Sequence, residues 1–279
     1  MSKLVTIDVC TTNMTNSRRT NVEILPLFTS KYLKEETRTV PTSSLNINKG
    51  KLGLTTSVPI THTKVSKRSL KNKKVLLTFG PTWVPIDNVR VISNISTGKL
   101  GHLLVDLLKK EGTQLTVLQG PVVAQLKSQS IRVVEFRFYD ELASLMKVEL
   151  KRQYDIIIHA AAVSDYELTN PFKKKISSRL SRLKFDLKPT AKIIEKIKKA
   201  SPNSLLVGFK LADNINTDSV RQEVGKLFQK AKCDLVVVNS LTKNKYRGHI
   251  LDPKRNVLAT AQRREELSRK LIHLLRERV

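Results

Sequence analysis

Four consecutive residues at the start of an expected helix have the composition of a phosphate-binding turn. They are Ser96, Thr97, Gly98 and Lys99. Five leucines on one face of residues 98–110 predict the helix that follows. Backbone N–H groups at a helix N-terminus, two hydroxyl groups and an ammonium group all favour an anion. An ordinary Ser/Thr N-cap would use the same residues, so the turn alone leaves both interpretations open.

Gly98 and a second glycine three residues later supply only half of a dinucleotide-binding signature. Gly98 and Gly101 match the end of a G-x-G-x-x-G pattern, but the 18 residues from 80 to 97 replace its tight turn. The next expected strand ends at Gln119, where an acidic residue would hold a ribose. We therefore do not expect a nicotinamide-dependent oxidoreductase.

The elements that must position this turn are alternating strands and helices. Strands are expected at 75–79, 115–118, 131–136, 155–163, 204–209 and 234–239, and helices at 98–110, 140–152, 191–199, 219–230 and 263–278. Runs at 248–251 and 256–260 predict a late hairpin, and the Lys-rich stretch between 163 and 191 is expected to be irregular. The pattern predicts an α/β, Rossmann-like doubly wound fold with a mainly parallel sheet. Ligands are expected beyond the carboxyl ends of its strands.

Composition divides the chain into a basic N-terminal extension and a globular part. The 279 residues include 51 Lys+Arg and 24 Asp+Glu, and the net charge of +27 favours anionic partners. Residues 1–74 hold 21 Ser/Thr, 14 Lys/Arg and only 4 Asp/Glu, which cannot bury enough apolar surface to become ordered. We expect residues 1–74 to be disordered and residues 75–279 to form one domain. A solvated tail and an organelle-targeting leader both remain open for the extension.

Cysteine usage and hydropathy narrow the cellular setting. Only Cys10 and Cys233 occur, without the spacing of a zinc site or a disulfide framework. No window approaches the roughly 18 apolar residues of a membrane span. Residues 1–30 lack the apolar core of a secretory signal. We expect a soluble, cytoplasmic protein without a membrane partner.

Several motifs follow one another in a fixed order over nearly the whole globular part. They are T-F-G-P-T from Thr78, P-I-D-N-V-R from Pro85, I-S-N-I-S-T-G-K-L-G from Ile92, I-H-A-A-A-V-S-D-Y from Ile158, K-I-S-S from Lys175, L-K-P-T-A-K-I-I from Leu187 and V-G-F-K-L from Val207. Together they resemble the phosphopantothenoylcysteine synthetase family in its stand-alone bacterial form.

The resemblance implies a ligase of coenzyme A biosynthesis. Such a ligase joins 4'-phosphopantothenate to L-cysteine through an acyl-nucleotide intermediate, and it releases a nucleoside monophosphate and pyrophosphate. The resemblance also implies CTP as the nucleotide, Mg2+ as the accompanying ion and a homodimer. It implies a nucleotide-binding domain over residues 75–279, with a Lys-rich flap.

Three residues match positions that act on the reacting groups in this family. Asn94 matches the asparagine that holds the acyl nucleotide, because an amide donor can bind an acyl oxygen without adding charge. Arg90 matches an arginine whose guanidinium can clamp an anion, and Lys175 matches the flap lysine over the reacting phosphate. A turn asparagine, a surface ion pair and a solvated charge run are the structural alternatives. The family's substrate positions fall on Arg90, Asn94 and Ala162.

A larger set matches the nucleotide site of the family. Asp165 matches a residue that recognises the base by accepting hydrogen bonds from an exocyclic amine. Lys226 and Lys230 lie one turn apart on an expected helix, so both could reach the triphosphate. The full set is Gly80, Ser96, Thr97, Gly98, Lys99, Ala160, Ala161, Asp165, Lys175, Lys192, Phe209, Lys226 and Lys230. The metal ligands stay unassigned, and the chain departs from the family pattern at Asn239-Ser240 and at Ala191.

A second class of function, nucleic-acid binding, would need only the positive charge of the chain. Residues 173–199 contain 11 Lys/Arg against Asp186 and Glu195, and such a run binds polynucleotide phosphates without any small-molecule site. Phe185 is the only aromatic residue in the run, which is too few for base stacking. We therefore expect small molecules, and not nucleic acid, as the partners.

Overall fold

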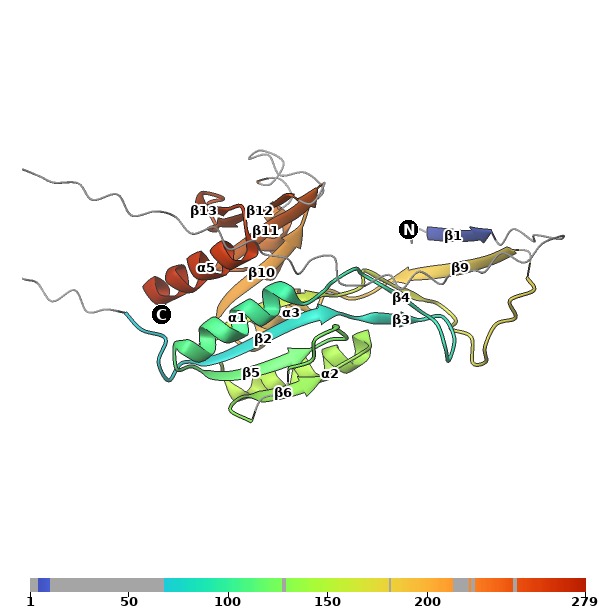
Figure 1. The fold of residues 1–279 in the computed structure, drawn as a ribbon, viewed down its shortest axis with the longest axis horizontal. Helices are drawn as coiled ribbons and strands as arrows, with labels where there is room; N and C mark the ends of the chain where they lie inside the picture. Colours follow the sequence, from blue (N-terminus) through green and yellow to red (C-terminus); the bar gives the residue numbers. More distant parts are fainter. Residues whose placement is uncertain are drawn as a thin grey trace, which may run out of the picture. The chain divides into compact units, whose positions relative to one another are not determined.

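The computed structural model of the chain centres on one eight-stranded sheet (Figure 1). In spatial order its strands are β13 (Val257–Ala261), β12 (Lys245–Leu251), β11 (Leu235–Thr242), β10 (Leu205–Leu211), β7 (Ile156–Ala162), β2 (Lys74–Pro81), β5 (Gln114–Gln119) and β6 (Arg132–Glu135). The strands from β11 to β6 are parallel, and β12 and β13 form an antiparallel hairpin. This confirms the predicted mainly parallel α/β sheet with a late hairpin.

The structure describes residues 5–10, 68–126, 129–180, 182–212, 221, 224–242 and 245–279. The helix expected at 219–230 is only partly within them. Its described end is a π-helical turn, η2 (Leu227–Ala231), in place of a regular α-helical turn.

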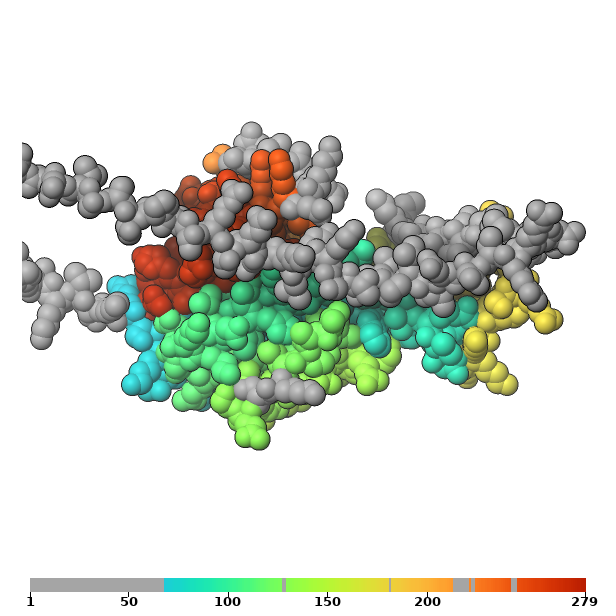
Figure 2. Space-filling view, viewed as in Figure 1, coloured from blue at the N-terminus to red at the C-terminus, as the bar shows by residue number. Residues whose placement is uncertain are grey.

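Helices cover both faces of the sheet and bury most of its central strands, such as β2. On one face lie α1 (Lys99–Lys110) and α5 (Arg264–Arg278), whose surfaces adjoin in Figure 2. On the other face lie α2 (Tyr139–Glu149), the 3-10 turn η1 (Leu150–Arg152), α3 (Ile194–Ala200) and η2. Along β2, Val75, Leu77 and Phe79 join the first core, whereas Leu76 joins the second. A strand covered on both sides needs apolar residues at every position, which explains its unbroken apolar run.

Beyond the carboxyl ends of β2 and β7 the chain forms a smaller unit, which we call the flap arm (residues 82–93 and 166–189). It contains the hairpin of β3 (Trp83–Pro85) and β4 (Val91–Ser93) and a sheet of β8 (Tyr166–Leu168), β9 (Arg182–Pro189) and β1 (Val5–Cys10) (Figure 1). A small apolar core of its own holds it together, formed by Val84, Leu168, Ile176, Phe185 and Leu187. The Lys-rich stretch that we expected to be irregular is therefore partly β-structure.

The N-terminal boundary differs from the expectation in two places. Leu70 is fully buried in the first core, so the domain begins about five residues earlier than residue 75. The backbone of Val5–Cys10 forms β1, antiparallel to β9, so this segment is not irregular as predicted. The prediction of disorder for the rest of the extension concerns residues 1–4 and 11–67, which lie outside the described residues.

Candidate active site

The carboxyl ends of β2 and β7 meet where the strand order reverses. β2 is the first strand of the sheet in the chain, and it lies between β5 and β7. Ligands of open α/β sheets bind at such a switch point. Gly80 pairs with Ala161 here, and Ala160 and Ala162 are paired with the residues on either side. Four residues of the predicted site are thus brought together on adjacent strands.

Asn94 extends from the loop after β4 to the same edge of the sheet. Its Nδ2 lies 3.2 Å from the carbonyl oxygen of Ala162 and 3.4 Å from that of Val163. The side chain is exposed, so a ligand can approach it. The amide that is expected to hold an acyl oxygen therefore donates to the end of β7 in this structure.

The turn before α1 ends in an uncapped helix. Gly98 is the N-cap residue with a φ of 73°, and no side chain among the described residues caps the helix. The first turn has no acidic residue, and the Lys99 N–H lies 3.4 Å from Thr97 Oγ1. A Cβ on Gly101 would come within 2.2 Å of the Phe79 ring, so α1 packs closely on β2. Uncapped N–H groups at this edge favour the anion interpretation over the N-cap interpretation.

Arg90 joins the β3–β4 loop to the Lys-rich segment of the flap arm. Its Nε and Nη2 donate to Asp87 Oδ2 at 3.0 and 2.6 Å, and Nη2 also donates to the Ile176 carbonyl oxygen at 2.6 Å. The Asp87 side chain is fully buried, whereas the Arg90 side chain is 39% exposed. Hydrogen bonds to Asp87, led by that of the Ile176 N–H and aided by that of Arg90, hold the pKa of its carboxyl well below the usual range. The ion pair that was the structural alternative for Arg90 is thus present, although its carboxylate is buried and not on the surface.

Lys175 directly precedes this anchored residue. The Lys175 side chain is exposed, whereas Ile176 is buried in the small core of the flap arm. The structure thus brings the segment that carries Lys175 against the loop that carries Arg90. Among the residues that the structure describes, none forms a hydrogen bond or ion pair with the Lys175 ammonium group.

The remaining predicted nucleotide-site residues are less closely associated. Asp165, at the end of β7, forms an ion pair with Lys192, so two of the predicted residues meet. Phe209 lies near the carboxyl end of β10 and packs against the first core. Lys226 and Lys230 are exposed at either end of η2, and no described hydrogen bond or ion pair joins them to the other predicted residues.

Sequence reasoning missed a network of hydroxyl groups where the flap arm leaves the sheet. Thr82 Oγ1 donates to Ser164 Oγ at 3.2 Å and accepts the Ser164 N–H at 2.9 Å. Thr190 Oγ1 donates to the Ser164 carbonyl oxygen at 2.6 Å. All three residues are buried, and each directly follows or closely follows a strand. The only sequence signal for this network was that all three hydroxyl residues follow strands within the motifs of the family.

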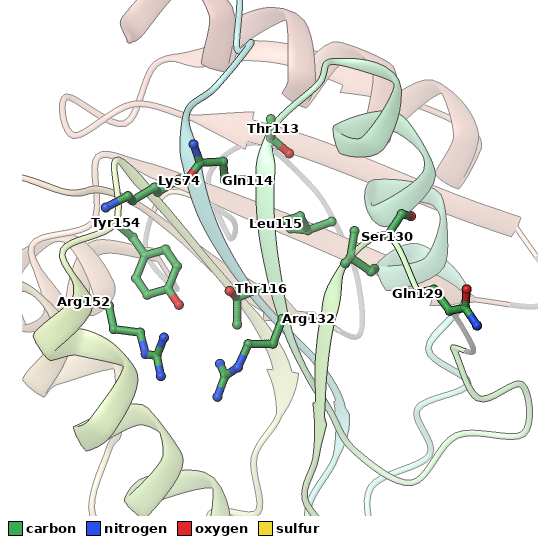
Figure 3. A pocket seen from close by; sticks show the side chains of 11 residues that line it. Lys74, Thr113, Gln114, Leu115, Thr116, Gln129, Ser130, Arg132, Arg152 and Tyr154 are labelled. Atoms are coloured by element: carbon green, nitrogen blue, oxygen red, sulfur yellow. The ribbon is translucent and has the colours of Figure 1, made fainter.

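The amino edge of the sheet holds a hollow of about 660 Å³ with a different character (Figure 3). Arg132 and Arg152 line it and point toward the Tyr154 hydroxyl group. The fully buried Glu149 carboxylate lies 2.6 Å from Arg132, 3.3 Å from Arg152 and 2.6 Å from that hydroxyl group. Burial, aided by the Glu149 hydrogen bond, raises the pKa of Tyr154 to about 12. Because α2 also ends here, the guanidinium groups neutralise a carboxylate and a helix C-terminus.

Neither a metal cage nor a membrane helix is found in the part of the chain that the structure describes. No group of three or more His, Cys, Asp or Glu side chains there could hold a metal ion. No described helix is both long enough and apolar enough to cross a membrane. Mg2+ at phosphate sites usually keeps its waters and binds through the phosphates and one or two carboxylates.

The fold and this edge define a Rossmann-like α/β domain with a helix start that no described side chain caps and with a basic flap arm. The chain belongs to the family described as the DNA/pantothenate metabolism flavoprotein C-terminal domain, whose model matches residues 70–276. This match confirms the resemblance inferred from the motifs.

Known proteins similar to the chain agree with the family assignment. The coenzyme A biosynthesis bifunctional protein CoaBC of Thermococcus kodakarensis is 34% identical over 181 residues, which cover 64% of this chain and 44% of that protein. A cysteine/cysteine sulfinic acid decarboxylase from an unknown prokaryotic organism is 36% identical over 179 residues, 64% of this chain and 48% of that protein. The chain thus matches less than half the length of these relatives.

Two solved structures share the fold. The DNA/pantothenate metabolism flavoprotein of Streptococcus pneumoniae superimposes with a TM-score of 0.65 and 25% identity, covering 74% of this chain and 100% of that one. A Cab2 mutant in complex with phosphopantothenate-cysteine has a TM-score of 0.61 and 17% identity, covering 75% of this chain and 87% of that one. At 17% identity, the similarity to the Cab2 mutant shows a shared fold and nothing more.

Proposed function

We propose that the chain is a phosphopantothenate–cysteine ligase of coenzyme A biosynthesis. The observation that carries the proposal is the meeting of Asn94, the end of β7 and the uncapped turn of α1 at the switch point of the sheet. The family match and the CoaBC relatives support the same reaction class. A cytoplasmic location is part of the same proposal.

The chemistry requires a carboxylate to be activated before an amine can displace its oxygen. In the first step the carboxylate of 4'-phosphopantothenate attacks the α-phosphorus of the nucleotide, and pyrophosphate leaves. In the second step the amine of L-cysteine attacks the acyl carbon, an amide bond forms and the nucleoside monophosphate leaves with the electron pair of the broken bond. Charge develops on the phosphorus and then on the acyl oxygen, where fixed donors stabilise it best.

Each part of the site has a role in these steps. The N–H groups and hydroxyl groups of residues 96–99 bind phosphate oxygens of the triphosphate. Asn94 exchanges a carbonyl partner on β7 for the acyl oxygen of the intermediate. Lys175 approaches the reacting phosphate from the flap arm, and its ammonium group stabilises the charge that develops there. Mg2+, when bound with the nucleotide, neutralises phosphate charge.

CTP is our proposed nucleotide. Asp165 is exposed at the end of β7, beside the proposed phosphate site, and its carboxylate can accept hydrogen bonds from the exocyclic amine of cytosine. Lys192 holds that carboxylate in the absence of a base. Lys226, Lys230 and Phe209 would lie along the rest of the nucleotide.

A homodimer is part of the proposal. Val89 and Val91 in the β3–β4 loop and Phe172 in the flap arm are 63%, 39% and 42% exposed. Apolar side chains gathered on one small unit favour a contact with a second copy of the chain. Sedimentation of the active protein as a monomer would contradict this part.

The test is a pyrophosphate-release assay with the purified full-length chain. We expect release only when phosphopantothenate and Mg2+ accompany a nucleotide, and continued turnover only when L-cysteine is added. CTP and ATP are compared at equal concentration, and we expect CTP to be used better. Equal or better use of ATP would overturn the choice of CTP. Failure to form the amide product with either nucleotide would overturn the proposed ligase activity.

A further inference from the structure

Asp87 is a buried carboxylate that joins two segments far apart in the sequence. Its Oδ1 accepts the N–H groups of Val89 and Arg90 at 2.9 and 2.8 Å, which closes the β3–β4 turn. Its Oδ2 accepts the Arg90 guanidinium and, at 3.0 Å, the N–H group of Ile176, which lies 89 residues further along the chain. Every one of these partners is a donor, so the site suits a charged acceptor without hydrogens of its own.

Ile176 is held through all of its groups. Its N–H group donates to Asp87, its carbonyl oxygen accepts from Arg90, and its side chain is buried with Val84 and Leu168. The residues on either side of it are exposed. Ile176 is therefore a fixed point within an otherwise exposed loop.

A second connection lies four residues earlier on the same loop. The Phe172 N–H group donates to the Ile86 carbonyl oxygen at 2.9 Å, next to Asp87. Lys173, Lys174 and Lys175 thus lie between two connections to the same β3–β4 loop. Short spans fixed at both ends sample few conformations, so the direction in which Lys175 projects depends on these connections.

We propose that Asp87 is a positioning residue, which fixes the span of Lys173–Lys175 by holding Ile176 and Arg90 and thereby presents Lys175 to the reacting phosphate. The structural part of this inference stands on the contacts above. Its effect on turnover rests on the proposed function. Asp87 touches no reacting atom in this account, and it acts on turnover only by positioning Lys175, with Arg90 as part of the connection that holds the span.

The structural part is tested by amide hydrogen exchange of the full-length chain. In Asp87→Asn, the new amide N–H group would face donors, and we expect exchange in the segment 173–180 to rise about 10- to 100-fold, the range of a hydrogen bond to a charged group. Asp87→Glu keeps the charge and should restore part of the protection. Glu111→Gln is the matched control, because Glu111 also pairs with an arginine, Arg276, between α1 and α5. It should leave exchange of 173–180 unchanged.

The effect on turnover is tested by a double-mutant cycle. We expect Asp87→Asn to lower kcat at least about tenfold in the otherwise natural chain, with little change in the KM for the nucleotide. In a Lys175→Gln background the same change should cost less than about threefold, because the group that Asp87 positions is already gone. A purely structural role would lower the activity equally in both backgrounds.

Each outcome decides one part of the inference. Unchanged exchange of 173–180 in Asp87→Asn overturns the positioning role, whether or not the chain is a ligase. Increased exchange with unaltered kcat, or an equal loss in both backgrounds, overturns the link to Lys175. If the natural chain shows no ligase activity, the proposed function fails, and the exchange result still decides whether Asp87 fixes the segment. Glu111→Gln should turn over at the rate of the natural chain.

Discussion

The two edges of the central sheet use the same residue types in opposite ways. At the amino edge, Arg132 and Arg152 converge on one buried carboxylate, Glu149, beside the C-terminus of α2. At the carboxyl edge, within the part of the chain that the structure describes, α1 begins without a side-chain cap and without an acid in its first turn, and the exposed Lys99 ammonium lies 3.6 Å from Glu265 of α5. The hollow at the amino edge is lined by cations, yet Glu149 and the C-terminus of α2 offset part of their charge. Basic residues therefore favour an anion most where the neighbouring helix ends and carboxylates offset the least of their charge.

The largest effect should come from changing Asn94 at the carboxyl edge. Asn94→Asp would place a carboxylate against the carbonyl oxygens of Ala162 and Val163 and against the developing charge of the acyl group. We expect turnover to fall about 100- to 1000-fold, the cost of losing one fixed donor in such a site. Pyrophosphate release measures the loss, with thermal unfolding as the check on folding. A loss below about tenfold would separate Asn94 from the chemistry.

Removing the charge of Lys175 should have the next largest effect. Lys175→Gln should still bind the substrates and form the acyl nucleotide but break it down slowly, with overall turnover reduced about 100-fold. Rapid quenching followed by mass spectrometry detects the stalled intermediate. Lys173→Gln, in the same exposed run, is the matched control and should stay close to the natural rate. Unchanged turnover in Lys175→Gln would remove this lysine from the mechanism.

A change at the amino edge should affect stability and not catalysis. Glu149→Gln leaves two guanidinium groups beside a neutral amide, and we expect the free energy of unfolding to fall by about 1–3 kcal/mol. The two arginines are partly exposed, which keeps the loss below that of a fully buried pair. Urea unfolding measures the change, and the kcat of the folded variant should equal that of the natural chain. Reduced kcat at natural stability would show that this edge, too, serves the reaction.

The smallest effect is expected at the ion pair of Glu111 and Arg276, which takes part in neither the candidate active site nor the hollow at the amino edge. The Arg276 hydrogen bond, joined by charge attraction and opposed by burial, lowers the pKa of Glu111. A lowered pKa stabilises the folded chain above the ordinary glutamate value of about 4.3, and this contribution is lost as the pH falls through the folded value. Glu111→Gln should therefore cost at most about 1 kcal/mol near pH 7 and nothing at about pH 2. An equal cost at both pH values, measured by urea unfolding, would contradict the charge-based explanation.

How much the sequence reveals depends on how regular each segment is. β2, β7 and β10 were predictable because strands covered on both faces need continuous apolar residues, and the switch point follows from their order. β9 was missed although residues 182–188 alternate between polar and apolar side chains, which is the pattern of a strand covered on one face. Its pairing with β1 and β8 could not be predicted, because neither partner is adjacent in a local motif. Propensity alone also gave no sign that the helix at 219–230 ends in a π-helical turn.

In the candidate site, too, contacts within one motif could be predicted from the sequence, whereas contacts between distant segments could not. Asn94 and the turn of residues 96–99 lie within one motif, so their proximity could be predicted from spacing. The role of Asp87 could not, because its partner Ile176 lies 89 residues away and nothing in the local pattern couples them. The buried Glu149 likewise resembled an ordinary helix-end acid until its partners from β6 and η1 were visible.

The hydroxyl network of Thr82, Ser164 and Thr190 gives the flap arm two unlike attachments. Where the arm leaves the sheet, neutral hydroxyl groups hold it, and these do not titrate or respond strongly to salt. Further out, charged partners hold it through Ile176. A bound anion that competes with Asp87 for Arg90 would therefore loosen the outer segment while the base of the arm stays closed, which confines rearrangement to the part that carries the flap lysine.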